Sequence, residues 1–460
     1  MTATTTNLVT ARQVPKRLLL SALALAQMLI GIDYNIVFVA LPRIANLGFS
    51  EQGLQWVVSA YAIAFGGLLL LGGRLVDRYG SRTLFLLGVG LFAIGSLAGG
   101  LATSPGLLIA GRAIQGLGGA ALSPAILALL ASTFDEGAER NKAISIWGGA
   151  GSAGMVIGSI LGGLLTQAFG WRSVFLVNLP LAIIVIGLAL FSAPAPSTNH
   201  ADERSDLPGA VLTVAGPVLI VLGFTWATNS GWAAPVTWIL LIAAIVCFLA
   251  LIVIESRTAK PLIDLALLRN PRLRIGAAST FVFMAGFGAI AYFMTLYFQQ
   301  DRGLDALQTG LAFVVPCAGV LIGTHIGGRI ATRGLGRSLI VGNLVGVIFT
   351  LMLALVVHDT TTWVLIMALL FALSVGQGIT FTTMYATATT GTATNQQGTA
   401  GGIATTGQQL GGAIGLAVLV NITNGTTTPT RDALLTITGI LAAGVLLGFA
   451  EKRVERTHQS

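Results

Sequence analysis

The chain has 460 residues, of which 54% are hydrophobic and 9% are charged, and its formal net charge is +8. Soluble domains carry about 25% charged residues, so this composition excludes a soluble globular protein and predicts an integral membrane protein. Its two cysteines, Cys247 and Cys317, and its four histidines lack the spacing of a disulfide framework or a metal site. We therefore expect no metal and no cofactor. The sequence also lacks a phosphate-binding loop and a nucleophile–base pair, which argues against an enzyme.

Apolar runs recur along the whole chain, and each is close to the roughly 20 residues that cross a bilayer as a helix. Helices satisfy their own backbone hydrogen bonds in hydrocarbon, so we expect an all-α integral membrane protein. The fourteen runs lie near residues 18–41, 53–72, 83–103, 106–131, 143–166, 173–193, 208–228, 236–255, 275–299, 307–330, 338–357, 362–388, 400–421 and 433–450.

The first run contains Asp33, a carboxylate deep in a hydrophobic segment. An ionisable group there costs at least a few kcal/mol, so it marks a functional site. Burial disfavours the charged form of a carboxyl, whereas a nearby cation favours it. We expect Asp33 to bind and release a proton in a partly hydrated cavity. Its expected partner is Arg112, the basic residue well inside a span, whose guanidinium keeps its own proton. The alternative is a permanent ion pair that holds two helices together.

The positions of lysine and arginine predict the orientation. With the N-terminus inside, basic residues gather in the loops on one side, and the other side keeps only Arg43, Arg172, Arg302 and Arg431. Loops rich in Lys and Arg are cytoplasmic, so we expect both termini in the cytoplasm. The basic surplus is then a topology signal, and we expect no nucleic-acid partner.

Two loops share a pattern. Residues 73–82 match residues 328–337 in the first glycine, three arginines and the apolar third position, with Thr332 in place of Asp77. Duplicated six-helix halves with a substrate site near the midplane are a transporter architecture. The expected segments are a tail 1–17, a six-helix bundle 18–193, a linker 194–272 with inserted helices near 208–228 and 236–255, a second six-helix bundle 273–450, and a tail 451–460.

Several motifs, in this order and spacing, resemble the major facilitator superfamily and its fourteen-helix drug:proton antiporter branch. They are residues 31–42, 73–82, 112–120, 171–180 with an Asn-Leu-Pro stretch at 178–180, 231–232, 261–265 and 407–413. The resemblance implies a proton-coupled secondary transporter that exports hydrophobic or amphipathic small molecules, such as drugs or antibiotics, by alternating access. It also implies a multi-pass protein of the bacterial inner membrane whose partners are substrate, protons and lipid. We expect a monomer.

Two departures from the family pattern concern the substrate. Ser159 follows Gly158 where the antiporters usually carry a Gly-Pro pair in helix 5. No further acid lies within a span of the second half, because the acids there are at span ends or in loops: Asp301, Asp305, Asp359 and Asp432. Both departures weaken an assignment to polycationic drugs, and the first also weakens strict antiport.

The loop 73–82 is expected to gate the transport cycle. Gly73 and Gly80 allow a tight turn and close helix approach. The resemblance implies that Asp77, with Arg78 and Arg82, forms pairs in one access state and releases them in the other. The alternative is a set of solvated loop charges.

Small residues predict closely packed helix faces along which helices can slide. Those of the fifth and thirteenth spans recur at three- and four-residue spacing: Gly151, Gly154, Gly158, Gly162, Gly411 and Gly415. Gln408 shares the second face, as either an interhelical hydrogen-bond partner or a cavity ligand.

An apolar cavity with a few polar groups would suit varied amphipathic substrates. The candidate lining residues are Tyr34, Asn35, Gln115, Trp147, Met284, Phe287, Tyr292, Phe381, Tyr385 and Gln408. The alternative for the aromatic side chains is core packing or contact with lipid.

His325 is a candidate second titrating site, because histidine titrates near neutrality. Together with Arg112 it defines an alternative function, the transport of an anionic metabolite or nutrient. An uncharged histidine hydrogen-bonded between helices is the simpler reading.

Overall fold

The computed structural model describes residues 15–135, 138–192, 207–258, 267–357, 361–392 and 397–457. All regular structure in these ranges is helical, and thirteen helical segments within them are long and apolar enough to cross a membrane. The predicted all-α membrane class is confirmed. The span predicted at 208–228 corresponds to α9 (Leu207–Ser230), in which the apolar stretch is the shorter Val214–Phe224. A total of fourteen spans therefore stays a prediction.

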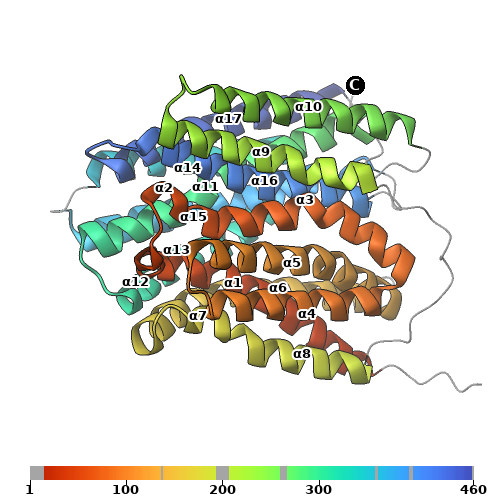
Figure 1. Cartoon of the computed structure of the whole chain (residues 1–460). Coiled ribbons are helices and arrows are strands. Elements are labelled where there is room, and N and C mark those ends of the chain that lie inside the picture. The colour runs from red at the N-terminus through yellow and green to blue at the C-terminus, as the bar shows by residue number, and fades with distance from the viewer. Residues whose placement is uncertain are drawn as a thin grey trace, which may run out of the picture.

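The first half of the chain folds into long helices that run side by side (Figure 1). They are α1 (Lys16–Ile44), α3 (Trp56–Tyr79), α4 (Ser81–Gly100), α5 (Pro105–Thr133), α6 (Ala138–Phe169) and α8 (Asn178–Ser192), with the short segments η1 (Ala45–Leu47), α2 (Glu51–Leu54) and α7 (Ser173–Leu176) between them. Helix α1 packs against α6 and α8, and α5 packs against α3 and α4. Apolar residues cover most faces of these helices, as a membrane bundle requires.

The second half repeats this pairing. Its helices are η2 (Leu267–Arg269), α11 (Pro271–Leu296), the π-helical η3 (Tyr297–Asp301), α12 (Ala306–Ala312), α13 (Val314–Ala331), α14 (Leu335–Val356), α15 (Trp363–Thr389), α16 (Gln397–Thr423) and α17 (Pro429–Thr457). The pairs α11–α16, α13–α15 and α14–α15 correspond to α1–α6, α3–α5 and α4–α5. This recurrence agrees with the repeated loop sequence, while the predicted domain boundaries stay a prediction.

The predicted C-terminal tail 451–460 is helical where it is described, because α17 continues to Thr457. Glu451 is buried there, and its Oε1 lies 3.2 Å from Arg272 Nε of α11. Glu455, one turn later, accepts hydrogen bonds from the N–H groups of Leu335 and Gly336 at the start of α14. These contacts hold the last turns of α17 against the bundle, which hydropathy alone does not reveal.

The inserted helices α9 and α10 (Pro235–Arg257) lie at one edge of the bundle (Figure 1). Helix α9 contacts both α3 and α16, and Val221 of α9 belongs to an apolar cluster with Ala62 and Ile63 of α3 and Ala413 of α16. The insertion therefore covers the line along which α3 of the first half meets α16 of the second.

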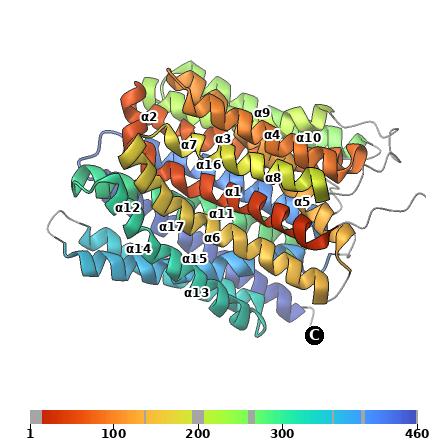
Figure 2. The same ribbon diagram turned by 90° about the horizontal axis from the view of Figure 1, so that it is seen from below.

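The two halves face each other across the bundle, with α4, α7 and α8 on one side and α12 to α15 on the other (Figure 2). We call the end that holds the start of α1 and the end of α17 the terminal end, and the other the opposite end. At the opposite end Gln167 donates to Asp305 at 3.4 Å, and Gln299 donates to the carbonyl of Val39 at 2.8 Å. The halves thus contact each other at the opposite end.

Glycines bring α1 and α6 close together. A β-carbon added at Gly154 would lie 2.5 Å from the carbonyl oxygen of Met28, and one at Gly158 would lie 2.5 Å from that of Ile32. Gly162 approaches Ile36 in the same way. In the second half, Gly411 and Gly415 of α16 lie against Phe281 and Ala285 of α11. Both predicted small-residue faces therefore lie at close helix contacts.

This contact predicts the effect of a substitution in α6. Gly158→Val should lower the free energy of unfolding by about 1–3 kcal/mol, because the added carbons collide with α1 backbone in a filled interface. Gly149→Val is the matched control, since a β-carbon at Gly149 meets no atom within 4 Å. The measurement is the thermal unfolding midpoint of each purified variant in detergent. Equal midpoints for the two variants would contradict the packing described.

Candidate functional site

Asp33 lies midway along α1 and is fully buried, with 0% of its surface exposed. Its carboxylate accepts three hydrogen bonds from buried side chains. Oδ2 accepts from Arg112 Nη1 at 2.6 Å, and Oδ1 accepts from Gln115 Nε2 at 2.9 Å and Asn178 Nδ2 at 3.0 Å. All three N–H donors stabilise the charged form of the carboxyl.

Arg112 and Gln115 reach the same carboxylate because they are three residues apart on one face of α5. Arg112 Nη1 also donates to Gln115 Oε1 at 2.9 Å, and its Nε donates to the carbonyl of Val57 in α3 at 2.8 Å. The guanidinium stacks on the Tyr61 ring, 4.5 Å from its centroid. The arginine is thus fixed by groups from α1, α3 and α5, and only 2% of its surface is exposed.

Ser96 of α4 completes this set, which we call the Asp33 network (Asp33, Ser96, Arg112, Gln115 and Asn178). Its hydroxyl oxygen accepts from Gln115 Nε2 at 2.8 Å and from Asn178 Nδ2 at 3.3 Å. Three buried polar side chains, Ser96, Gln115 and Asn178, therefore surround one buried ion pair, and the network joins four helices. Removing either charged partner of such a pair costs about 3–5 kcal/mol, because the other charge is left uncompensated.

Part of this network is predictable from the sequence. The predicted pair of Asp33 and Arg112 is in direct contact in the structure. The partly hydrated cavity predicted around Asp33 is not present in the described part of the structure, because amide and guanidinium groups surround the fully buried carboxylate. Gln115 was assigned to the substrate cavity and instead binds Asp33 and Ser96.

Two members of the network were missed. Asn178 opens the Asn-Leu-Pro stretch that the sequence analysis quoted as a motif, so a polar residue at the start of an apolar span was the available signal. Ser96 is a single hydroxyl in an apolar helix, and no sequence pattern distinguishes it.

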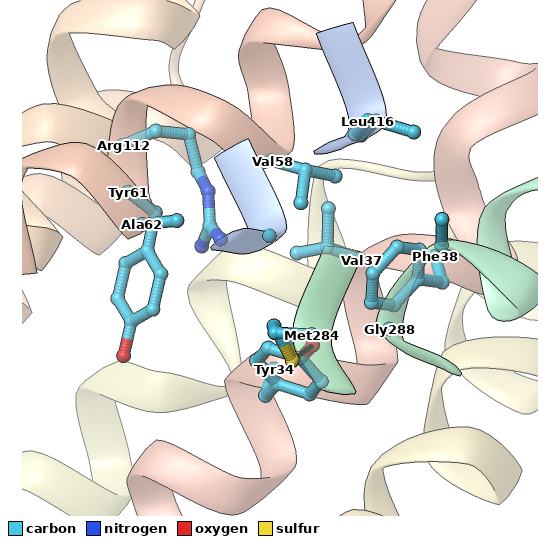
Figure 3. Close-up of a pocket in the computed structure, with 12 residues that line it drawn as sticks. Tyr34, Val37, Phe38, Val58, Tyr61, Ala62, Arg112, Met284, Gly288 and Leu416 are labelled. Atoms are coloured by element: carbon cyan, nitrogen blue, oxygen red, sulfur yellow. Dashed lines mark hydrogen bonds between the residues drawn. The ribbon is translucent and has the colours of Figure 1, made fainter. Parts of the chain in front are cut away.

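A small pocket lies beside Arg112, between the two halves (Figure 3). It is lined by Tyr34, Val37, Phe38, Val58, Tyr61, Ala62, Arg112, Met284, Gly288, Ala289, Gly412 and Leu416. The Tyr34 hydroxyl donates to Met284 Sδ across the pocket at 3.6 Å. The cavity volume of about 20 Å³ is enough for a water molecule and too small for a drug-sized ligand.

Of the ten predicted cavity residues, Tyr34 and Met284 line this pocket. Phe287 and Tyr292 are buried in an apolar cluster that joins both halves, where they pack against Phe283 and Phe293. Packing, the alternative reading for these rings, therefore describes them in this structure.

Two other predicted cavity residues lie in the first half away from the pocket. Asn35 donates to the carbonyl of Met155 at 3.0 Å and to Ser159 Oγ at 3.2 Å. Trp147 packs against the apolar core of that half. Asn35 therefore joins α1 to α6, the helix in which serine replaces the family's proline.

A polar group on the second half lies closer to the terminal end. The Tyr385 hydroxyl donates to Gln408 Oε1 at 2.8 Å and lies 3.2 Å from Thr405 Oγ1. Phe381, 38% exposed, packs its ring against Tyr385. Gln408 thus makes a contact between α15 and α16, and it sits one turn before Gly412, which lines the pocket.

The predicted gating loop is mostly helical. Helix α3 runs to Tyr79 and α4 begins at Ser81, so Gly73 and Arg78 lie in α3 and Gly80 alone joins the helices. Gly80 has φ +84°, a conformation that favours glycine. Arg82 donates to the carbonyl of Leu190 at 3.1 Å.

The remaining predicted residues can be placed briefly. The side chain of Asp77 lies outside the described residues. His325 is exposed on α13 and does not belong to the Asp33 network around Arg112. Among the described side chains, no cluster of three or more metal-binding residues occurs.

Comparison with known proteins places this geometry among transporters. Residues 23–416 match the family model of the Major Facilitator Superfamily. The chain is 38% identical over 403 residues to cephamycin export protein CmcT of Amycolatopsis lactamdurans, covering 86% of this chain and 83% of the relative. It is 36% identical over 410 residues to puromycin resistance protein pur8 of Streptomyces alboniger, covering 87% and 80%.

Solved structures share the fold at low sequence identity. A peptide transporter POT in complex with sulfate superposes with a TM-score of 0.71 at 16% identity, covering 97% of both chains. A mutant of the nucleoside transporter NupG superposes with a TM-score of 0.69 at 13% identity, covering 95% of this chain and 99% of that one. These two similarities show the fold alone.

Proposed function

The chain belongs to the major facilitator superfamily, and we propose that it exports hydrophobic or amphipathic small molecules in exchange for protons. The proposed export direction rests on relatives named for cephamycin export, puromycin resistance and lincomycin resistance. The proposed location is the bacterial inner membrane, with both termini in the cytoplasm, as the loop charges predict. The proposed active form is a monomer.

The observation that carries proton coupling is the Asp33–Arg112 pair, buried midway through α1 and beside the pocket between the halves. In the charged form, Asp33 neutralises Arg112. Protonation of Asp33 leaves the guanidinium charge uncompensated in a low-dielectric site, which is unfavourable. Proton binding therefore changes the energy of the arrangement that holds α1, α3 and α5 together, as a coupled conformational step requires.

The direction of access follows from the contacts between the halves. With the termini in the cytoplasm, the opposite end faces outward, and there Gln167 and Gln299 join the two halves. We therefore assign this conformation to a state closed toward the outside. One proton entering down a potential of 100 mV, negative inside, supplies about 2.3 kcal/mol, which is sufficient to drive a several-fold concentration of substrate.

The pocket lining supports an uncharged or weakly polar substrate. Apart from Arg112, whose charge Asp33 balances, its walls are aromatic and aliphatic, with Met284 as an adaptable surface. No carboxylate is among the residues that line it, which agrees with the sequence-based argument against polycations. The anion-transport alternative receives no support, because Arg112 is bound to Asp33 and His325 lies outside the network.

A resistance panel tests the export function. Expression in a bacterial host that lacks its own major efflux pumps should raise the inhibitory concentration of at least one of puromycin, lincomycin and a cephamycin several-fold. The measurement is growth inhibition at matched membrane expression, with the empty vector as control. Unchanged sensitivity to the whole panel, with the protein present in the membrane, would contradict export of this substrate class.

A further inference from the structure

Only one of the two polar atoms of the buried Asn178 amide is hydrogen-bonded to a described residue. Nδ2 donates to Asp33 Oδ1 and to Ser96 Oγ, whereas Oδ1 is buried and has no hydrogen-bond partner within the described residues. A buried acceptor without a partner is unfavourable and calls for an explanation. The opposite amide orientation would place Asn178 Oδ1 against a carboxylate oxygen, and two acceptors repel. The charge on Asp33 therefore explains the orientation that leaves Oδ1 idle.

Protonation of Asp33 reverses this preference. When hydronium gives a proton to Asp33 Oδ1 and leaves a neutral water molecule, an O–H bond forms and the oxygen becomes a donor, so it no longer favours Asn178 Nδ2. A half-turn of the Asn178 amide exchanges Nδ2 and Oδ1, since an amide carries two donors on one side and an acceptor on the other. Oδ1 then accepts from the Asp33 hydroxyl and from the hydroxyl of Ser96. Asp33 and Ser96 therefore keep Asn178 as a hydrogen-bond partner in both protonation states, and Nδ2 takes the position that Oδ1 held.

Gln115 cannot make this change. Its Nε2 also donates to Asp33, but its Oε1 accepts from Arg112 Nη1 at 2.9 Å. Reversing that amide would set Nε2 against a permanent cation. The orientation of Gln115 is fixed by Arg112, and Asn178 is the network amide whose second end is unconstrained.

The other groups around Asp33 either keep a permanent charge or are neutral. Arg112 of α5 is permanently charged, and the ionisable rings nearby are Tyr61 of α3 and Tyr34 of α1. Helices α4 and α8 present Ser96 and Asn178. Helix α6 packs Gly154 and Gly158 against α1 near this level, and the α11 residues that line the adjacent pocket are the neutral Met284, Gly288 and Ala289. The protonation-dependent partner of Asp33 is therefore the Asn178 amide.

We propose that Asn178 is a positioning residue whose amide reverses its orientation when Asp33 changes protonation state. Ser96 is its second hydrogen-bond partner in both orientations. The inference rests on the proposed proton coupling through Asp33. Because Asn178 is the first residue of α8, the reversal carries the proton signal from α1 to a helix that bears no charge of its own in this network.

Infrared difference spectroscopy on the full-length protein in lipid tests this reversal. Protein labelled with carbon-13 asparagine should show an amide carbonyl band that shifts between high and low pH with the same midpoint as the Asp33 carboxyl band. The band shift should vanish in Asn178→Ala and in Asp33→Asn. It should persist in Asn343→Ala, the matched control, because Asn343 of α14 is equally buried and also has an unpartnered Oδ1.

A second variant covers the case in which Asn178→Ala does not fold. Asn178→Ser removes the amide and keeps a hydroxyl, which can both donate to Asp33 and accept from it, so the asparagine band shift should vanish in this variant too.

An asparagine band that stays constant while Asp33 titrates, or a band shift that persists in the Asn178 variants, would overturn the amide reversal. These outcomes leave proton coupling intact if Asp33→Asn still abolishes it. Conversely, coupled transport that survives Asp33→Asn would overturn the proposed function itself.

Discussion

Asp33→Asn is expected to abolish uphill export and to leave the protein in the membrane. Asparagine keeps the size of the side chain and can still accept from Arg112, but it cannot take up a proton. Transport driven by a pH gradient should fall to the level of empty vesicles, measured as substrate accumulation in everted membrane vesicles. Downhill substrate movement without a gradient is expected to remain, because the pocket beside the network keeps its lining.

The matched control is Asp135→Asn, since the Asp135 side chain is 89% exposed at the terminal end and pairs only at long range with Lys16, at 3.5 Å. This variant should transport normally. Asp33→Asn also leaves Arg112 without its anion, at a cost of about 3–5 kcal/mol, so each rate must be divided by the amount of folded protein. Full gradient-driven transport by Asp33→Asn would rule out the assigned proton site.

Ser159→Cys is expected to lock the transporter under oxidising conditions. Helix α6, which carries Ser159, packs against α13, which carries Cys317, across the two halves, and Ser159 lies near enough to influence the Cys317 thiol, so the substitution places two thiols near each other. The resulting disulfide would hold the halves together on the side of the bundle where α6 also packs against α12. Alternating access requires these helices to separate, so transport should be lost on oxidation and restored by dithiothreitol.

The experiment is carried out in a Cys247→Ala variant, so that Cys317 is the single native thiol left. The control adds Cys317→Ala, which removes the partner of the new cysteine, and oxidation should then leave the transport rate unchanged. Mass spectrometry of peptides establishes whether the cross-link has formed. A cross-linked protein that transports at the full rate would show that α6 and α13 do not separate during the cycle.

The sequence predicts the helices well because hydropathy is a local property. Each apolar run near a membrane length became a helix, and glycines such as Gly158 lie where helices approach most closely. The boundaries were less accurate where polar residues continue a helix. Helix α3 extends through residues 73–79. Helix α17 continues past Glu451, because Arg272 and the N–H groups at the start of α14 bind its glutamates.

The sequence predicts only the charged part of the site. Asp33 and Arg112 are charged residues within apolar segments, and a buried charge needs a partner of opposite charge, so the sequence predicts that they pair. Ser96 and Asn178 are neutral, and their role depends on α4 and α8 meeting α1 at one level. Tertiary packing decides where these helices meet, and the spacing of residues along a single helix does not predict it.

The aromatic side chains show the same limit. Met284 and Phe287 are three residues apart in α11, yet Met284 lines the pocket and Phe287 fills the core. Composition identified a helix rich in rings and methionine, and the rotation of that helix against α1 and α17 decided which side chains face the space between the halves.

Substrate-driven proton movement in liposomes tests the central claim most directly. Purified wild-type protein is reconstituted with a pH-sensitive dye trapped inside, and the compound most strongly exported in the resistance panel is added outside. We predict that entry of the compound drives protons out and makes the interior alkaline, and that Asp33→Asn shows no such change. Substrate entry without proton movement in the wild type, or equal proton movement in Asp33→Asn, would contradict proton exchange through Asp33.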